Sequence, residues 1–253
     1  RTQGDEPNMK NMKADERKDV ANSPDGTLEE VCAWLAKNAS ESNPRVLNRQ
    51  DLQGELNLQP DESFAHLFLQ QVDSDEKAVQ LTQGFQDFTS AAWSPDGKKI
   101  ICASKVYAIH PDRERDNNIW VIDVASRQAR ELLSWPGYSL DNPSYSPDGT
   151  RISFDANTTN GRFYSQSILA TASASGENPT LLTQALDRDA GNAVWSADGK
   201  TIYFIAQSEG DIPLYSIPSK GGAIQRLTRE DGGVNDFDIR GDKVVYAFTE
   251  TKN

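Results

Sequence analysis

Three segments of the chain share one pattern of apolar and polar positions. Each has an aromatic residue, then Ser-x-Asp-Gly, two polar residues and an alternating apolar run. The copies start at Trp93, Tyr145 and Trp195, which are 52 and 50 residues apart. Asp-Gly between two apolar runs is typical of a β-hairpin, because glycine takes the positive φ of a tight turn and aspartate can bond its own backbone. The pattern predicts hairpin turns at three residue pairs: Asp96-Gly97, Asp148-Gly149 and Asp198-Gly199.

Two further strands are predicted in each repeat. An apolar third strand is expected at residues 66–69, 118–122, 167–169 and 213–217. A fourth strand, which ends in Leu-Thr or a variant of it, is expected at residues 79–82, 129–133, 180–183 and 224–228. Four strands at a regular period are typical of propeller blades, because stacked blades bury both faces of each sheet. We therefore predict an all-β fold, a partial β-propeller of about four four-stranded blades plus two strands from residues 234–248.

The N-terminal part of the chain does not follow this repeat. Residues 23–26 read Ser-Pro-Asp-Gly, but the apolar residues after them fall at helical spacing, from Leu28 to Leu35. Thr27 and Glu30 form a capping box, the pattern that starts a helix. We expect an amphipathic helix over residues 27–37, inside a charged N-terminal segment 1–43 that precedes the propeller at 44–253. The chain begins at Arg1 rather than Met, which suggests a processed chain or a piece of a longer one.

Composition excludes several classes of function. The 253 residues carry 26 Lys and Arg against 38 Asp and Glu, a net charge of −12 without a basic cluster, which argues against nucleic-acid binding. No apolar run reaches the length of a membrane span. Two cysteines and two histidines leave little for a disulfide framework or a metal centre, so no metal and no cofactor are expected. Residues 112–123 space acidic side chains like a calcium loop, but the sixth position lacks glycine, which favours a solvated loop.

The chain contains no Gly-x-Ser-x-Gly nucleophile motif, so no catalytic residues are expected in it. The nearest segment, residues 137–141, ends in aspartate, and we interpret it as a loop between blades. Neither His66 nor His110 has a plausible catalytic partner in the sequence. Arg49 and Asp51 are weak candidates for a binding surface toward a separate catalytic domain, although an exposed structural role is favoured for both.

The order aromatic-Ser-Pro-Asp-Gly-Lys-x-Ile, then Ile119-Trp120-Val121, then Leu-Thr, resembles two groups of propellers. One is the propeller of prolyl oligopeptidase-type serine peptidases, which include acylaminoacyl and dipeptidyl peptidases, and the other is TolB. The charged N-terminal segment and the loop at residues 110–118 favour the peptidases. The resemblance implies a non-catalytic propeller that gates and positions a peptide substrate for an α/β-hydrolase domain of the same parent polypeptide, after Asn253. It also implies a periplasmic or secreted location. The alternative is a TolB-like propeller that docks a protein partner, while a lyase-type propeller is disfavoured by the scarcity of histidine.

Overall fold

The computed structural model describes residues 2–3, 23, 25–39, 63–73, 75–84, 86–105, 116–159, 166–228 and 231–250. The chain divides into two compact units. The first comprises Arg1–Phe64 with His110–Arg113, and the second comprises Ala65–Ile109 with Glu114–Asn253. Among the residues that the structure describes, no helix has both the length and the apolar character needed to cross a membrane.

The first unit contains the predicted helix, α1 (Leu28–Ala39). The capping box is formed as expected: the amide of Thr27 donates to Glu30 Oε2 at 2.7 Å, and the amide of Glu30 donates to Thr27 Oγ1 at 3.4 Å. Asp25 and Gly26 form a turn ahead of the helix, so their likeness to the hairpin motif does not produce a hairpin. The unit also holds a short antiparallel pair, β1 (Thr2–Gln3) with β2 (Ser63–Phe64). Residues 44–49, where the predicted propeller segment begins, lie outside the described residues.

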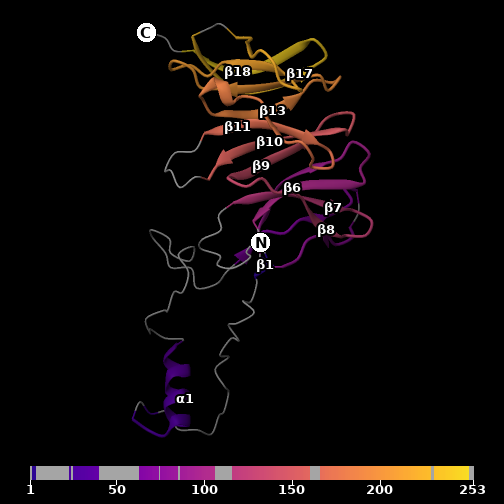
Figure 1. Cartoon of the computed structure of the whole chain (residues 1–253). Coiled ribbons are helices and arrows are strands. Elements are labelled where there is room, and N and C mark those ends of the chain that lie inside the picture. The colour runs from indigo at the N-terminus through magenta and orange to yellow at the C-terminus, as the bar shows by residue number, and fades with distance from the viewer. Residues whose placement is uncertain are drawn as a thin grey trace. The chain divides into compact units, whose positions relative to one another are not determined.

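The second unit is built around three four-stranded antiparallel sheets, which follow one another in chain order (Figure 1). Within each sheet the strands also lie in chain order, so each is a simple meander whose members we call its first to fourth strands. Their bounds are β5 (Phe88–Trp93), β6 (Lys99–Lys105), β7 (Asn117–Asp123) and β8 (Ala129–Leu133); β9 (Tyr138–Tyr145), β10 (Arg151–Thr158), β11 (Ser167–Ser173) and β12 (Thr180–Leu181); β13 (Ala190–Trp195), β14 (Thr201–Ala206), β15 (Leu214–Pro218) and β16 (Gln225–Arg226).

Two strand pairs complete the second unit. They are β3 (Phe68–Leu69) with β4 (Val79–Gln80), and β17 (Gly232–Arg240) with β18 (Lys243–Glu250). The fold class is confirmed, and the last pair matches the two strands predicted from residues 234–248. Among the described residues, the number of complete blades is three, against the predicted number of about four. The described part of the predicted first blade contributes β3 and β4 alone. A 3-10 turn, Gln184–Leu186, follows β12.

The core lies within and between the sheets. The second and third strands carry most of it, and side chains such as Ile101, Phe154, Leu169 and Phe204 are at most 1% exposed. These strands are apolar on both faces because a neighbouring sheet covers each face. One buried cluster joins Ile101 and Ile119 of the first complete sheet to Leu140 and other residues of the second, so adjacent sheets share one core.

Candidate functional site

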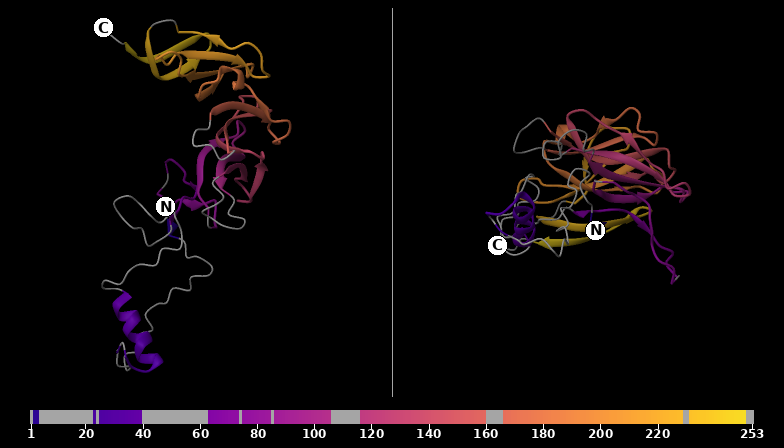
Figure 2. Two further views of the ribbon diagram at one scale, coloured as in Figure 1. Left: turned by 60° about the vertical axis from the view of Figure 1, so that its left-hand side comes forward. Right: turned by 90° about the horizontal axis from the view of Figure 1, so that it is seen from below.

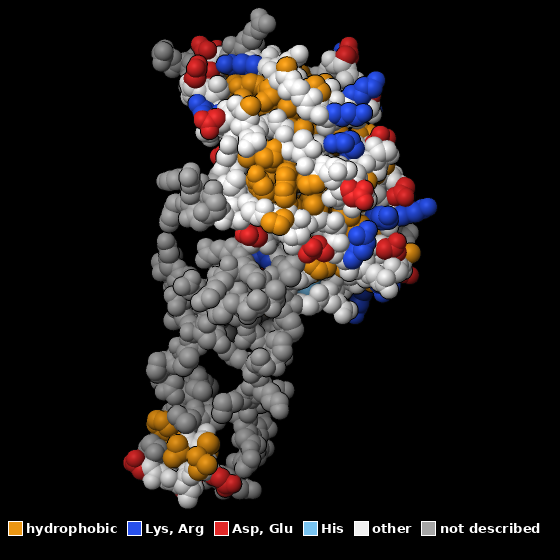
Figure 3. Space-filling view, in the orientation of Figure 1, with side chains coloured by type: hydrophobic (Ala, Val, Ile, Leu, Met, Phe, Trp, Pro, Cys, Tyr) orange, Lys and Arg blue, Asp and Glu red, His pale blue; other side chains and the backbone are white. Residues whose placement is uncertain are grey.

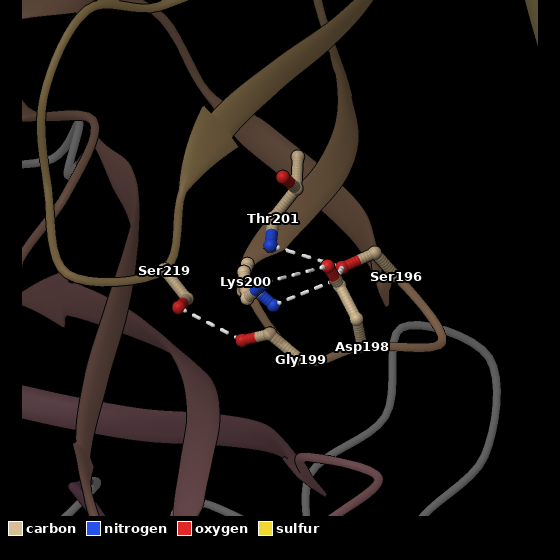
Figure 4. Close-up of polar contacts among 6 residues, drawn as sticks. All are labelled: Ser196, Asp198, Gly199, Lys200, Thr201 and Ser219. Carbon is tan, nitrogen blue, oxygen red and sulfur yellow. Dashed lines mark hydrogen bonds and ion pairs between the residues drawn. The ribbon is translucent and has the colours of Figure 1, made fainter. Parts of the chain in front are cut away.

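The repeated Ser-x-Asp-Gly motif forms the turn between the first and second strands of each complete sheet. In the third copy, Ser196 Oγ donates to Asp198 Oδ1 at 2.7 Å and accepts the amide hydrogen of Thr201 at 2.9 Å (Figure 4). The amide of Lys200 donates to the same carboxylate oxygen at 3.1 Å. Gly199 has a φ of 68°, the same as Gly97 and Gly149. The serine and the aspartate thus hold the turn closed from inside.

The electrostatics of the three turns follow from this geometry. Hydrogen bonds from the serine hydroxyl and from a turn amide lower the pKa of Asp96, Asp148 and Asp198 below the ordinary value of an aspartate. All three carboxylates are solvent-exposed, and each stays ionised as a hydrogen-bond acceptor for its own hairpin. These aspartates have a structural role in the turn. A carboxylate with a lowered pKa and local hydrogen-bond donors is poorly suited to accept a proton at neutral pH, as a general base must.

Hydrogen bonds also connect one sheet to the next. The indole Nε1 of Trp195, at the end of a first strand, donates to Ser153 Oγ in the second strand of the preceding sheet, at 2.9 Å. Thr171 Oγ1, on β11, donates to the carbonyl of Ser219, directly after β15, at 3.3 Å, and Ser219 Oγ in turn donates to the carbonyl of Gly199 within the third sheet at 2.9 Å. These bonds are mostly buried, and they fix the orientation of the second complete sheet against the third.

A polar cluster, made of Ser90, Asn117, Asp141, Asn142, Asp155 and Asn157, lies where the first two complete sheets meet. Asp141 of β9 and Asp155 of β10 are directly opposite each other in the antiparallel register. Asp155 is only 8% exposed, and burial raises the pKa of its carboxyl to about 6, with the negative charge of Asp141 adding to the effect. Asn142 Nδ2 donates to Asp155 Oδ2 at 2.8 Å and partly offsets this rise.

The remaining hydrogen bonds of the cluster reach the neighbouring strands. Asn142 Oδ1 accepts the hydroxyl hydrogen of Ser90, on β5, at 2.8 Å. Asp141 accepts Asn117 Nδ2 at 2.6 Å and Asn157 Nδ2 at 3.3 Å. Three amide side chains therefore solvate two opposed carboxylates, and the cluster ties β5 to β9 and β10. Within the described ranges, no group of three or more His, Cys, Asp or Glu side chains is arranged to hold a metal ion.

Sequence reasoning missed this cluster, and one prediction near it is wrong. Residues 138–141 were expected in a loop between blades, but they belong to β9, and Leu140 is fully buried. The reason is a β-bulge beside Asn142, whose φ is 49°; it interrupts the apolar alternation that identifies a strand. The available signal was Asp155 itself, a single acidic residue inside the apolar run of residues 152–156.

Other residues singled out from the sequence have local roles or lie outside the described residues. His66 Nδ1 is 3.2 Å from Thr82 Oγ1, and its ring lies beside Phe88. Asp123, the last position of the calcium-like spacing, accepts hydrogen bonds from the amide and hydroxyl of Ser126 in the turn before β8. Burial raises the pKa of Cys102 to about 12, so its thiol stays protonated. The positions outside the described residues are Arg49, Asp51, His110, Asp112 and Glu114.

No protein-family model matches the chain. It is 28% identical to dipeptidyl-peptidase 5 of Porphyromonas gingivalis over 172 residues, which cover 67% of this chain and 25% of that protein. It is also 31% identical to the uncharacterized peptidase YuxL of Bacillus subtilis over 101 residues, which cover 38% of this chain and 15% of that protein. Its sequence relatives are peptidases. The chain spans a quarter or less of the length of each of these two relatives.

The solved structures give the fold. The β-propeller domain of the Trilobed protease from Pyrococcus furiosus matches with a TM-score of 0.51 and 18% identity, over 69% of this chain and 48% of that one. At this identity the likeness concerns architecture, and it identifies the sheets as propeller blades. The resemblance to peptidase propellers stated from the motifs is therefore confirmed by sequence relatives and by fold.

Proposed function

We propose that this chain is the non-catalytic propeller of a serine exopeptidase, which gates and positions peptide substrates for an α/β-hydrolase domain of the same parent polypeptide. The observation that carries the proposal is the match to dipeptidyl-peptidase 5, which covers 67% of this chain but 25% of that protein. The uncovered part of such a relative is long enough for a catalytic domain of ordinary size. A periplasmic or secreted location fits a peptidase that digests extracellular peptides and belongs to the same proposal.

In this proposal, gating depends on the contacts and hydrogen bonds that keep neighbouring blades from separating. The first strands contact one another from sheet to sheet, β5 with β9 and β13 with β17. The bonds from Ser90 to Asn142 and from Trp195 to Ser153 resist separation of adjacent blades. In the proposal, the propeller of the parent polypeptide keeps its blades together. It therefore admits short, extended peptides and excludes folded proteins by size, which suits an enzyme that removes residues from peptide ends.

The chain by itself is proposed to be inactive toward peptides. Acyl transfer needs an activated nucleophile, an oriented base and an oxyanion hole. The sequence has no nucleophile elbow, and His66 lies beside a threonine hydroxyl and a phenylalanine ring. Cleavage of dipeptidyl chromogenic substrates by the purified chain, abolished by a serine-reactive inhibitor, would contradict the proposal.

The decisive test uses the parent polypeptide. We expect a Gly-x-Ser-x-Gly motif in its reading frame and cleavage of dipeptidyl chromogenic substrates, with rates that fall steeply as peptide length increases. Trp195→Ala, which removes a bond between blades, should raise the rate on long peptides more than the rate on a chromogenic dipeptide. Trp93→Ala is the matched control, since Trp93 is 52% exposed and its removal should leave the length dependence unchanged.

The same experiment addresses the alternative of a TolB-like docking propeller. That alternative predicts no nucleophile motif in the parent reading frame, no peptidase activity and a stable complex with another protein. The ratio of the cleavage rates on dipeptides and long peptides could also be the same in the unmodified parent and in its Trp195→Ala variant. In that case the peptidase activity stands and the gating role is wrong.

A further inference from the structure

The five-residue sequence Ser-Pro-Asp-Gly-Thr occurs twice in the chain, at residues 23–27 and at residues 146–150. The first copy lies ahead of α1, where Asp25 and Gly26 form a turn (Figures 1 and 2). The second copy forms the hairpin between β9 and β10. Because the two sequences are identical, a difference between the reactivities of their Asp-Gly pairs must come mainly from the fold.

An Asp-Gly pair can rearrange without an enzyme. The glycine nitrogen bonds to the side-chain carboxyl carbon, and the amide proton and the carboxyl hydroxyl leave as water, which closes a five-membered succinimide ring. Water then opens the ring at either carbonyl: one opening restores aspartate, and the other gives isoaspartate, in which the main chain runs through the side chain. Glycine favours ring closure because it has no Cβ to hinder the approach of its nitrogen. The reaction therefore needs a free glycine amide and a carboxyl group that can turn toward it.

The hairpin copy restrains both reacting groups. The amide of Gly149 donates to the carbonyl of Ser146 at 2.8 Å. Asp148 Oδ1 accepts the hydroxyl hydrogen of Ser146 at 2.6 Å and the amide hydrogen of Thr150 at 3.0 Å. These bonds, from the serine hydroxyl above all, lower the pKa of Asp148, so its carboxylate stays ionised and lacks the hydroxyl that must leave.

The chain has five Asp-Gly pairs, and the glycine amide is occupied in three further pairs. In the hairpin turns at residues 94–97 and 196–199, the glycine amide donates to the serine carbonyl at 2.9 Å, and the serine hydroxyl donates to the aspartate (Figure 4). In the pair Asp231-Gly232, the amide of Gly232 donates to Asp211 Oδ1 at 2.9 Å. Like the amide of Gly149, these amides are unavailable for ring closure.

The copy ahead of α1 lacks both restraints. Within the part of the chain that the structure describes, the amide of Gly26 donates no hydrogen bond and the carboxyl of Asp25 accepts none. Thr27 is the equivalent of Thr150. Its amide donates to Glu30 Oε2 at 2.7 Å, as part of the capping box, and is not available to Asp25. Both Asp25 and Gly26 are exposed, and Figure 3 shows acidic side chains at the surface of this part.

We propose that Asp25 is a site of spontaneous isoaspartate formation in the folded chain, whereas Asp148, within the same five-residue sequence, is protected by its hairpin. Water is released when the ring closes and consumed when it opens, so the net reaction is an isomerisation that needs no cofactor or oxidant. The product is a modified residue directly ahead of the capping box of α1. The inference is independent of the proposed peptidase role.

The first test measures isoaspartate at each site of the full chain, incubated at mildly acidic pH with and without guanidinium chloride. Peptide mapping with electron-transfer fragmentation resolves the sites, which matters because Asn160-Gly161, outside the described residues, can form the same product. In the denaturant the two identical sequences should react at similar rates. Folding should slow Asp148 at least about tenfold more than Asp25, which corresponds to about 1.4 kcal/mol in the free energy of local opening. A smaller difference overturns the proposal.

The second test removes one restraint from the hairpin copy. Ser146→Ala deletes the hydroxyl that donates to Asp148. It should raise the rate of isoaspartate formation at Asp148 about fivefold, as expected for the loss of one hydrogen bond. Asp198, whose own turn is unchanged, is the control in the same molecule, and its rate should stay the same. An unchanged rate at Asp148, or an equal rise at Asp198, overturns the protective role of the turn.

The product should also weaken the start of α1. Isoaspartate at position 25 adds a methylene group to the main chain between Ser23 and Thr27, and the 3.3 Å bond from the Ser23 amide to the Glu30 carbonyl spans this segment. Hydrogen exchange in the first turn of α1 should therefore be faster in the aged chain than in aged Asp25→Glu, which keeps the charge but would need a larger ring to rearrange. Equal exchange in the two aged chains, with isoaspartate present in the first, overturns this consequence.

Discussion

Gly149 lies against the ring of Pro95, which belongs to the Ser-Pro-Asp-Gly turn of the preceding sheet: a Cβ built on Gly149 would be 3.6 Å from Pro95 Cδ. Gly199 meets Pro147 in the same way, at 3.8 Å. The turns therefore stack along the series of blades. Gly241, the turn glycine of the last strand pair, has nothing within 4 Å, and position 197 of the preceding turn is alanine instead of proline.

We expect Ala197→Pro to stabilise the chain. Pro95 and Pro147 occupy this position in turns with the same internal hydrogen bonds, so the ring fits the backbone there. A proline in a compatible turn raises the free energy of unfolding by about 0.4–1 kcal/mol through the unfolded state. Urea unfolding measures the gain, and Ala197→Ser is the control that should show none. A loss of stability would mean that the third turn differs in backbone from the other two.

Asp155 makes stability depend on pH in a defined window. Its pKa is raised from 3.8 to about 6, so between these values the folded chain binds a proton that the unfolded chain does not. The free energy of unfolding should therefore fall as pH rises from about 4 to 6, and stay lower above that, by at most about 3 kcal/mol. Asp155→Asn should remove this slope and raise the melting temperature at pH 7.

The control for this titration is Asp187→Asn, because the side chain of Asp187 is 94% exposed. It should leave the slope between pH 4 and 6 unchanged. Asp141→Asn should make the slope smaller, since the charge of Asp141 contributes to the raised pKa of Asp155. A slope that persists in Asp155→Asn would assign the titration to another group.

The serines of the Ser-x-Asp-Gly turns should contribute measurably to the free energy of unfolding. Ser196→Ala removes a donor to Asp198 and an acceptor for the amide of Thr201, and we expect a loss of about 1 kcal/mol. It should also raise the pKa of Asp198 toward the ordinary value, which NMR titration can follow. Ser175→Ala is the comparison, because Ser175 is exposed and its hydroxyl, 2.8 Å from that of Ser173, contacts no backbone group of a hairpin turn between a first and a second strand. Equal losses from the two variants would contradict the role assigned to the turn.

The bond between Trp195 and Ser153 should contribute to the cohesion of adjacent sheets. Trp195→Phe leaves the buried Ser153 hydroxyl without its indole donor and should cost about 1–3 kcal/mol. A double-mutant cycle with Ser153→Ala isolates the coupling between the two residues. Trp93→Phe, at the exposed equivalent of Trp195, should lower the free energy of unfolding less than Trp195→Phe or Ser153→Ala does. A coupling near zero would show that packing alone joins the two sheets.

The blades could be predicted because their signals are local. The Ser-x-Asp-Gly turn, the Leu-Thr ending and the capping box of Thr27 and Glu30 each act within a few residues of sequence. β9 was partly missed because the β-bulge beside Asn142, whose φ is 49°, interrupts the alternation of apolar residues that identifies a strand. The pairing of Asp141 with Asp155 was missed because a carboxylate opposed to another carboxylate is recognised only once the register of two strands is known.

The meander order of the complete sheets has a consequence for how the chain folds. Each strand pairs with the next one in sequence, so most pairings within a blade close short loops, and a blade can form before its neighbours do. Contacts between blades then add from one neighbour to the next, as in repeat proteins. Opening should accordingly begin at the two terminal strand pairs and advance inward, with the backbone amides of β9–β12, held by a sheet on either side, exchanging last.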